Sequence, residues 1–107
     1  MNPQDRLLEL AKACPEWFEK DYSLGQNYRI RRGYYFGRLI NEVDPDPALF
    51  LYVTHEIAWI NGWIPVQNVK QKHWDIVDSL TGESVLKGPK KGTPDESLIQ
   101  TLEENKN

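Results

Sequence analysis

The chain has 107 residues, of which 13 are basic and 16 acidic, and its net charge is -3 at neutral pH. With 39% hydrophobic residues, four Trp, five Tyr and three Phe, it carries too much apolar surface for a disordered polymer. A chain of this length buries roughly 65% of its unfolded surface, so we predict a single small globular domain over residues 1–107. The negative charge argues against general binding of polyanions.

The sequence lacks the signals of export and of membrane insertion. Its longest mostly apolar stretch, Ala48 to Val53, is far shorter than the roughly 20 residues that a membrane-spanning helix needs. The polar segment from Met1 to Glu9 has no apolar run followed by a cleavage site. A single Cys14 cannot form an internal disulfide. We therefore expect a cytoplasmic protein with no membrane partner.

A first helix is predicted from Pro3 to Lys20. Apolar residues recur there at spacings of three and four, and most charged residues fall elsewhere on the helix. Pro15 removes one helical hydrogen bond and crowds the carbonyl group four residues earlier, so a break is expected near Cys14. A loop is predicted at Ser23 to Gln26.

From Tyr28 to about Lys87, β-branched and aromatic residues favour a run of antiparallel strands. Two candidate strands, Tyr28 to Arg32 and Tyr34 to Ile40, meet at Gly33. A turn is predicted at Glu42 to Pro47, where Asp-Pro occurs twice.

The stretch from Leu49 to Ile60 fits two structures. A helix is supported by Asp46 as a cap, by Pro47 at the first helical position and by a glycine beyond the end. A strand is supported because apolar residues at alternate positions share one side, and because Asn61-Gly62 is a strong hairpin signal. We favour a strand, a turn and a second strand, and the helix stays open as the alternative.

Trp63 to Val69 is then expected as the returning strand. His73 to Asp78 and Glu83 to Lys87 flank a turn and predict a second hairpin. After a basic loop, Thr93 begins a capped helix that is expected to end near Leu102. The predicted fold is α+β: an antiparallel meander of about five strands, which can curl toward a small barrel, packed with an N-terminal and a short C-terminal helix.

Charge is segregated along the sequence. One window from Tyr22 to Asn41 contains no acid, four tyrosines, Phe36 and four of the five arginines, namely Arg29, Arg31, Arg32 and Arg38. Arg and Tyr are enriched at protein interfaces and on platforms that bind single-stranded nucleic acid. The same pattern also fits an extended strand with tyrosines in the core and arginines in solvent.

The tryptophans suggest an apolar anchor. In a two-residue hairpin, Trp59 and Trp63 emerge on opposite faces near the tip, so at least one is exposed or covered by another molecule. An exposed Trp beside a turn is typical of an interface anchor. The candidate partner-binding residues are Arg29, Arg31, Arg38, Tyr35 and Trp63.

The sequence contains no complete motif for catalysis or metal binding. His55-Glu56 begins a zinc-protease pattern, but Trp59 stands where the second His is required. The other histidine is 18 positions away, and no serine lies in a nucleophile elbow. We predict no catalytic residue, no metal and no cofactor.

These observations predict a non-catalytic protein-interaction or accessory module that binds a protein with an acidic surface. Nucleic-acid binding by the same Arg and Tyr strip is one alternative. A small ligand-binding or enzymatic fold, with a pocket lined by Trp and His55, is the other.

Overall fold

The computed structural model describes residues 1–22 and 27–106. Its contacts divide the chain into two compact units, Met1–Leu49 (unit 1) and Phe50–Asn107 (unit 2). The predicted α+β class is confirmed, whereas the predicted single domain over residues 1–107 stays a prediction. The predicted loop at Ser23 to Gln26 lies outside the described residues.

Unit 1 begins with helix α1 (Pro3–Ala13). The side chain of Asn2 caps it by accepting the Asp5 N–H at 2.8 Å, and Pro3 occupies its first position. The helix ends just before Cys14, so the predicted break is confirmed. The predicted continuation to Lys20 is wrong, because the chain turns after Pro15 and becomes a strand.

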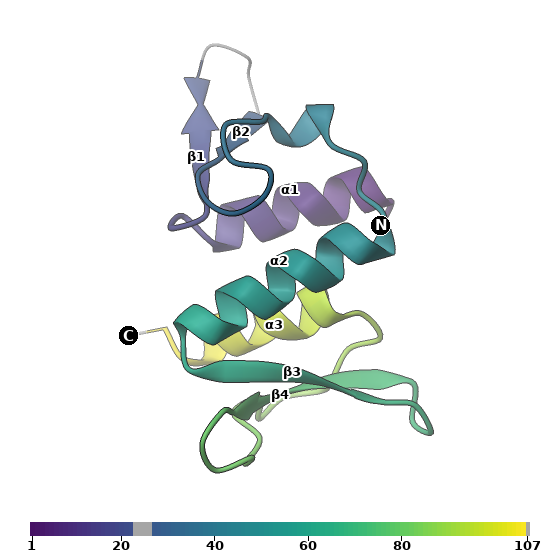
Figure 1. Cartoon of the computed structure of the whole chain (residues 1–107). Helices are drawn as coiled ribbons and strands as arrows, with labels where there is room; N and C mark the ends of the chain where they lie inside the picture. The colour runs from purple at the N-terminus through teal and green to yellow at the C-terminus, as the bar shows by residue number, and fades with distance from the viewer. Residues whose placement is uncertain (23–26, 107) are drawn as a thin grey trace. The chain divides into compact units, whose positions relative to one another are not determined.

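Two short strands pack beside this helix. Strand β1 (Phe18–Asp21) pairs antiparallel with β2 (Asn27–Ile30), and α1 contacts both strands and the 3₁₀ turn η2 (Ile40–Glu42), as Figure 1 shows. The core of the unit consists of apolar residues that are at most 7% exposed: Leu7, Leu10, Ala11, Cys14, Trp17, Phe18, Ile30, Ile40, Val43 and Leu49.

Helix α2 (Pro47–Ile60) begins in unit 1 and continues into unit 2, so the strand favoured for this stretch is wrong. The cap is the one that the helical alternative requires: the Asp46 carboxylate accepts the Leu49 N–H at 2.8 Å. The buried residues follow helical spacing and include a threonine that is 0% exposed: Phe50, Val53, Thr54, Ile57 and Ala58. The apolar face of the helix is continuous only because Thr54, a polar residue, is buried within it.

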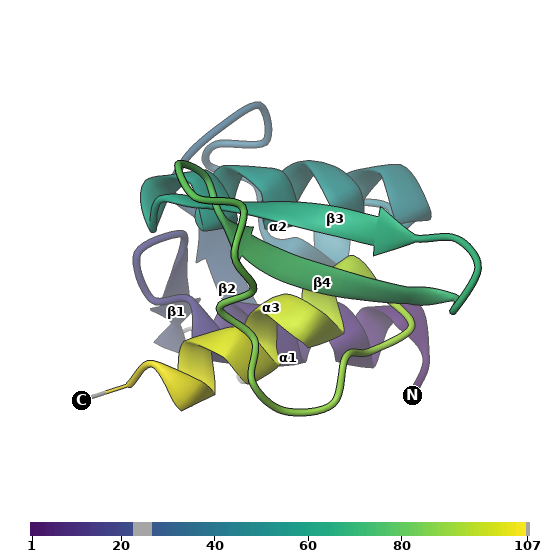
Figure 2. The same cartoon turned by 90° about the horizontal axis from the view of Figure 1, so that it is seen from below.

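The sheet of unit 2 is one hairpin. Strand β3 (Trp63–Asn68) pairs antiparallel with β4 (His73–Asp78), with Trp63 opposite Asp78 and Pro65 opposite Ile76. Helix α3 (Pro94–Glu104) contacts both strands, and Figure 2 shows it running along β4. The core of this unit also includes Ile76, Leu86 and Leu98.

The predicted five-stranded meander and its barrel-like variant are wrong, because the described residues form two separate two-stranded sheets. Leu49 to Ile60 is a helix, and Tyr34 to Ile40 forms a turn and part of η2. Glu83 to Lys87 lies along the outer edge of β4 but forms only an isolated bridge, between Val77 and Ser84. Within the described residues, no helix is long and apolar enough to cross a membrane.

Candidate functional site

Residues 31–38 of unit 1 form a closed loop that we call the basic-aromatic loop. At its base the Ile30 N–H donates to the Arg38 carbonyl oxygen at 2.8 Å, and the Gly37 N–H donates to the Ile30 carbonyl oxygen at 2.7 Å. Next to these hydrogen bonds, Arg29 and Leu39 form an isolated antiparallel β-bridge. These backbone contacts restrict the conformations of the loop.

Two glycines shape the turns inside the loop. Gly33 and Gly37 have φ angles of 79° and 88°, a region that other residues rarely adopt. The Phe36 N–H donates to the Gly33 carbonyl oxygen at 3.2 Å, and the Arg38 N–H donates to the Tyr35 carbonyl oxygen at 3.0 Å. The three consecutive aromatic residues therefore lie within two overlapping tight turns.

The aromatic rings of the loop differ in burial. Tyr34 is 85% exposed and Phe36 is 70% exposed. Tyr35 is half-buried, and its ring meets that of Tyr34 edge to face at 5.1 Å. Two large rings in solvent on one loop are unusual, because aromatic side chains gain the most from being covered.

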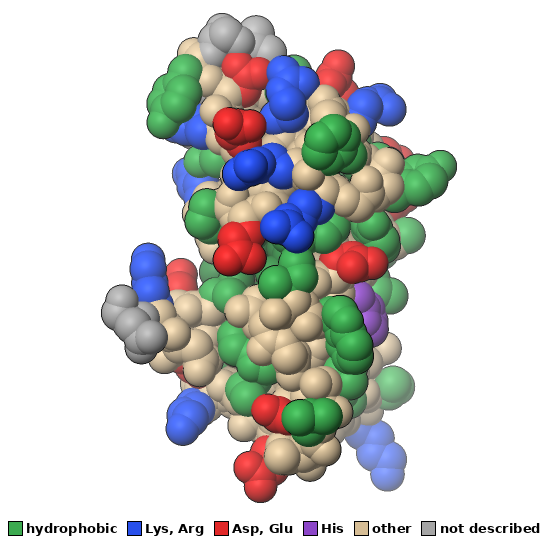
Figure 3. Space-filling model, turned by 60° about the vertical axis from the view of Figure 1, so that its left-hand side comes forward, with side chains coloured by type: hydrophobic (Ala, Val, Ile, Leu, Met, Phe, Trp, Pro, Cys, Tyr) green, Lys and Arg blue, Asp and Glu red, His purple; other side chains and the backbone are tan. Residues whose placement is uncertain are grey.

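In the part of the chain that the structure describes, no carboxylate forms an ion pair with an arginine of the loop. Arg31 and Arg32 are exposed, and within the described residues their guanidinium groups have no ion pair or hydrogen bond. Among residues 1–22 and 27–106, the guanidinium group of Arg38 donates only to the Glu42 backbone carbonyl oxygen, at 3.5 Å. Figure 3 shows Lys and Arg side chains on this face of unit 1, with hydrophobic and acidic side chains among them.

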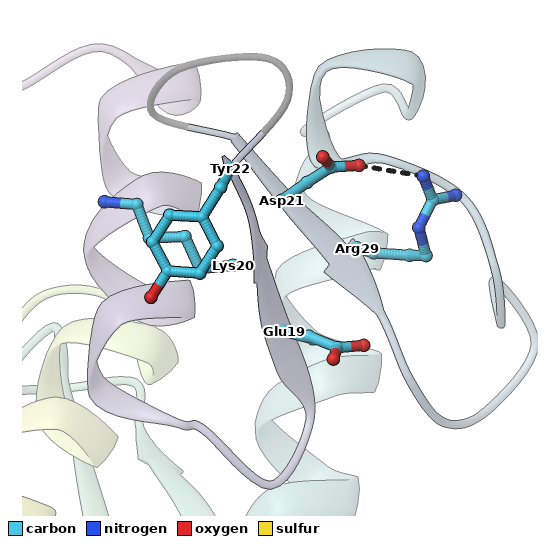
Figure 4. A pocket seen from close by; sticks show the side chains of 5 residues that line it. All are labelled: Glu19, Lys20, Asp21, Tyr22 and Arg29. Atoms are coloured by element: carbon cyan, nitrogen blue, oxygen red, sulfur yellow. Dashed lines mark hydrogen bonds and ion pairs between the residues drawn. The ribbon is translucent and has the colours of Figure 1, made fainter.

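Arg29 has a different environment from the other predicted contact residues. Its guanidinium group pairs with Asp21 at 2.9 Å and donates to the Gly37 carbonyl oxygen at 2.8 Å. Figure 4 shows this ion pair between β1 and β2. Arg29 therefore connects the loop to the sheet, and the Asp21 carboxylate largely neutralises its charge within unit 1.

A hollow of about 150 Å³ lies beside this ion pair. In Figure 4, Asp21 and Arg29 point to one side of the strands, and Lys20 lies beside Tyr22 on the other. The Lys20 ammonium group is 5.9 Å from the centre of the Tyr22 ring. Because pockets for small ligands usually enclose about 300 Å³ or more, this hollow gives no support to the ligand-binding alternative.

Of the five predicted contact residues, Arg29, Arg31, Tyr35 and Arg38 lie together in or beside the loop of unit 1. Trp63 lies in unit 2, half-buried on β3 opposite Asp78. The expected Asn61-Gly62 hairpin does not form, and Trp59, at the end of α2, is 65% exposed. That these residues bind a partner stays a prediction.

The predicted contact set omits Arg32, Tyr34 and Phe36, which are among the most exposed residues of the loop. The feature of the sequence that could have identified these residues is the pair of glycines around them. Gly33 and Gly37 enclose three aromatic residues, and such spacing favours a turn that exposes its side chains over a strand that buries every second one.

The lone cysteine is poorly suited to chemistry. Burial raises the pKa of the Cys14 thiol to about 12, and the nearby Glu16 carboxylate adds to the rise. Within the described ranges 1–22 and 27–106, no three His, Cys, Asp or Glu side chains are grouped so that they could hold a metal ion. Comparison with known proteins finds no matching family, no matching curated protein and no matching solved structure.

Proposed function

We propose that this protein is a non-catalytic docking module that binds an acidic partner protein through the basic-aromatic loop. One observation carries the proposal: two exposed rings, Tyr34 and Phe36, stand on a closed loop beside Arg31 and Arg32, whose charges are unpaired in the described part of the chain. Aromatic residues and Arg supply most of the binding energy at protein interfaces.

Each feature of the loop has a physical role in such a contact. The guanidinium groups of Arg31 and Arg32 can bind carboxylates in a two-pronged geometry. The rings of Tyr34 and Phe36 supply apolar area that becomes buried on contact. The backbone hydrogen bonds at Ile30 hold the loop in one shape, which lowers the entropy lost on binding.

Charge favours a protein partner over a nucleic acid. The chain as a whole carries a net charge of -3, and Glu42 follows the loop within four residues of Arg38. A long polyanion would meet these acids, whereas a partner protein can present a compact acidic patch. Nucleic acid could bind instead through Arg31, Arg32 and Arg38. The logarithm of the binding constant for a single strand would then change with the logarithm of the salt concentration with a slope of about -2.1.

The test compares the wild-type protein with two loop variants, Arg31→Ala/Arg32→Ala and Tyr34→Ala/Phe36→Ala. Immobilised proteins capture partners from an extract of the source cells, and Lys70→Ala/Lys72→Ala serves as the control with two cations removed elsewhere. We expect a captured protein to be lost with both loop variants and retained with the control. Titration of a labelled oligo(dT) strand at several salt concentrations is the parallel measurement.

The proposal is overturned if folded loop variants capture the same proteins as the wild type. It is also overturned if oligo(dT) binds near physiological salt and binding is lost with the loop variants, because the loop then binds nucleic acid. Circular dichroism spectra of the variants establish that they are folded.

A further inference from the structure

Unit 2 has an exposed apolar end made by Trp59, Ile60 and Leu80. Their side chains are 65%, 45% and 94% exposed. Figure 3 shows hydrophobic side chains gathered on the face of unit 2, with acidic side chains next to them. Single exposed apolar residues are common on protein surfaces, but three from two segments 20 positions apart form a candidate contact patch.

Hydrogen bonds hold the two segments together. The Gly62 N–H donates to the Trp59 carbonyl oxygen at 3.0 Å, and the Ser79 N–H donates to the Gly62 carbonyl oxygen at 2.9 Å. The end of α2 is therefore fixed beside the turn that carries Leu80. Backbone hydrogen bonds therefore hold the two segments of the apolar end side by side.

The Asp78 carboxylate fixes the turn itself. It accepts the N–H groups of Leu80 at 2.8 Å and Thr81 at 3.0 Å. These hydrogen bonds, that of Leu80 foremost, hold the pKa of Asp78 below its ordinary value, so this residue stays negatively charged in mildly acidic solution. Asp78 thus presents Leu80 to solvent and adds a negative charge beside it.

The border of the apolar end is acidic. The segments that form it, residues 56–63 and 78–83, contain Glu56, Asp78 and Glu83 and no Lys or Arg. Glu56 precedes Ile60 by one helical turn, and the Glu83 carbonyl oxygen accepts the Asp78 N–H at 2.8 Å. Both glutamates are exposed. An apolar surface bordered by carboxylates requires a partner that is both apolar and positively charged.

The basic-aromatic loop has the complementary composition. It carries the exposed rings of Tyr34 and Phe36 and the charges of Arg31 and Arg32, which have no ion pair with any described residue. Contact between two apolar ends would instead place carboxylates against carboxylates, which is unfavourable. Charge complementarity therefore favours contact between a loop and an apolar end over contact between two apolar ends.

Resting on the proposed docking function of the loop, we infer that its acidic partner is a second copy of this chain, whose apolar end receives the loop. Such a contact joins two different surfaces. It closes into a dimer when the exchange is reciprocal and otherwise extends to larger assemblies. In both cases the mass of the assembly rises with protein concentration.

Charge reversal tests the inference directly. Sedimentation velocity is measured over a range of concentrations for the wild type, for Arg31→Glu/Arg32→Glu and for Glu56→Lys/Glu83→Lys. Each variant alone places like charges on its loop and its apolar end, so we expect self-association to be lost. An equimolar mixture pairs an acidic loop with a basic end and a basic loop with an acidic end, so association should return.

Two further variants complete the design. Trp59→Ala should weaken self-association at least about tenfold, because a central Trp is the typical anchor of an interface. Lys70→Glu/Lys72→Glu reverses two charges outside both surfaces and should leave association unchanged. If a charge-reversed variant fails to fold, Arg31→Gln/Arg32→Gln and Glu56→Gln/Glu83→Gln remove the same charges more mildly.

The inference is wrong if the wild type stays monomeric at every concentration, or if mixing the two charge-reversed variants does not restore association. Its failure is distinct from that of the proposed function. The wild type can be monomeric and still capture an acidic protein that the loop variants do not capture. In that case the docking function of the loop stands, and its partner is a different protein.

Discussion

The hydroxyl group of Ser97 on α3 donates a hydrogen bond to the carbonyl oxygen of Trp74 on β4 at 2.8 Å. The oxygen atom of the Ser97 hydroxyl group in turn accepts the Lys91 N–H at 2.9 Å. Ser97 is 0% exposed, so one hydroxyl satisfies two backbone groups and joins the helix, the hairpin and the loop before the helix.

Replacement of this hydroxyl should therefore destabilise the protein. We expect Ser97→Ala to lower the free energy of unfolding by about 1–3 kcal/mol, because it leaves backbone groups without partners. Urea unfolding measures the change. Ser79→Ala, whose hydroxyl has no hydrogen bond among the described residues, is the matched control and should change the free energy by less than about 0.5 kcal/mol. Equal effects of the two substitutions would contradict the structural role of Ser97.

Arg29 should control the opening of the basic-aromatic loop. In Arg29→Ala the contacts to Asp21 and to the Gly37 carbonyl oxygen are lost. We expect amide hydrogen exchange of Ile30 and Gly37, measured by NMR, to accelerate about three- to tenfold. Global stability should change by less than about 1 kcal/mol, because the ion pair is partly exposed. Arg32→Ala is the control and should leave both exchange rates unchanged.

Acid should loosen the segment after β4. The Glu104 carboxylate accepts the N–H groups of Lys87 and Gly88, both at 2.7 Å. These bonds, that of Lys87 foremost, hold the pKa of Glu104 below its ordinary value. A carboxyl group with a lowered folded-state pKa stabilises the protein above its unfolded-state pKa, and this contribution is lost as pH falls through the folded-state value.

The measurement is the free energy of unfolding from about pH 6 to about pH 2, for the wild type and for Glu104→Gln. The wild type should lose more stability on acidification than the variant. Glu103→Gln, one residue away and exposed, should follow the wild-type curve. A Glu104→Gln curve parallel to that of the wild type would mean that this carboxylate does not stabilise the segment.

The thiol of Cys14 should be inert in the folded protein. Burial raises its pKa to about 12, so almost no thiolate is present at about pH 8. We expect a disulfide reagent such as Ellman's reagent to react only after unfolding in concentrated guanidinium chloride. Rapid modification of the folded protein would show that the region around α1 opens readily.

Local chemistry was sufficient to predict several boundaries. Pro15 predicted the break near Cys14, and the bounds of β4 agree with the structure at both ends, His73 and Asp78. The C-terminal helix was predicted from Thr93 and Pro94, and it begins at Pro94. The expected cap by Thr93 does not form, because its hydroxyl group donates to the Glu96 side chain and accepts no backbone N–H of the helix. These signals act within a few residues, so they can be read from the sequence.

What the sequence by itself determined is the α+β class, the starts of α1 and α3, the break near Cys14 and the concentration of arginines and rings in one window. Tertiary structure alone decided that Thr54 is buried and α2 helical, that β3 pairs with β4, and that Trp59 is exposed. It also decided that Asp21 pairs with Arg29, and that Arg31 and Arg32 have no carboxylate partner among the residues that the structure describes. Caps and proline breaks depend on neighbours along the chain, whereas burial and ion pairing depend on groups that only folding brings together.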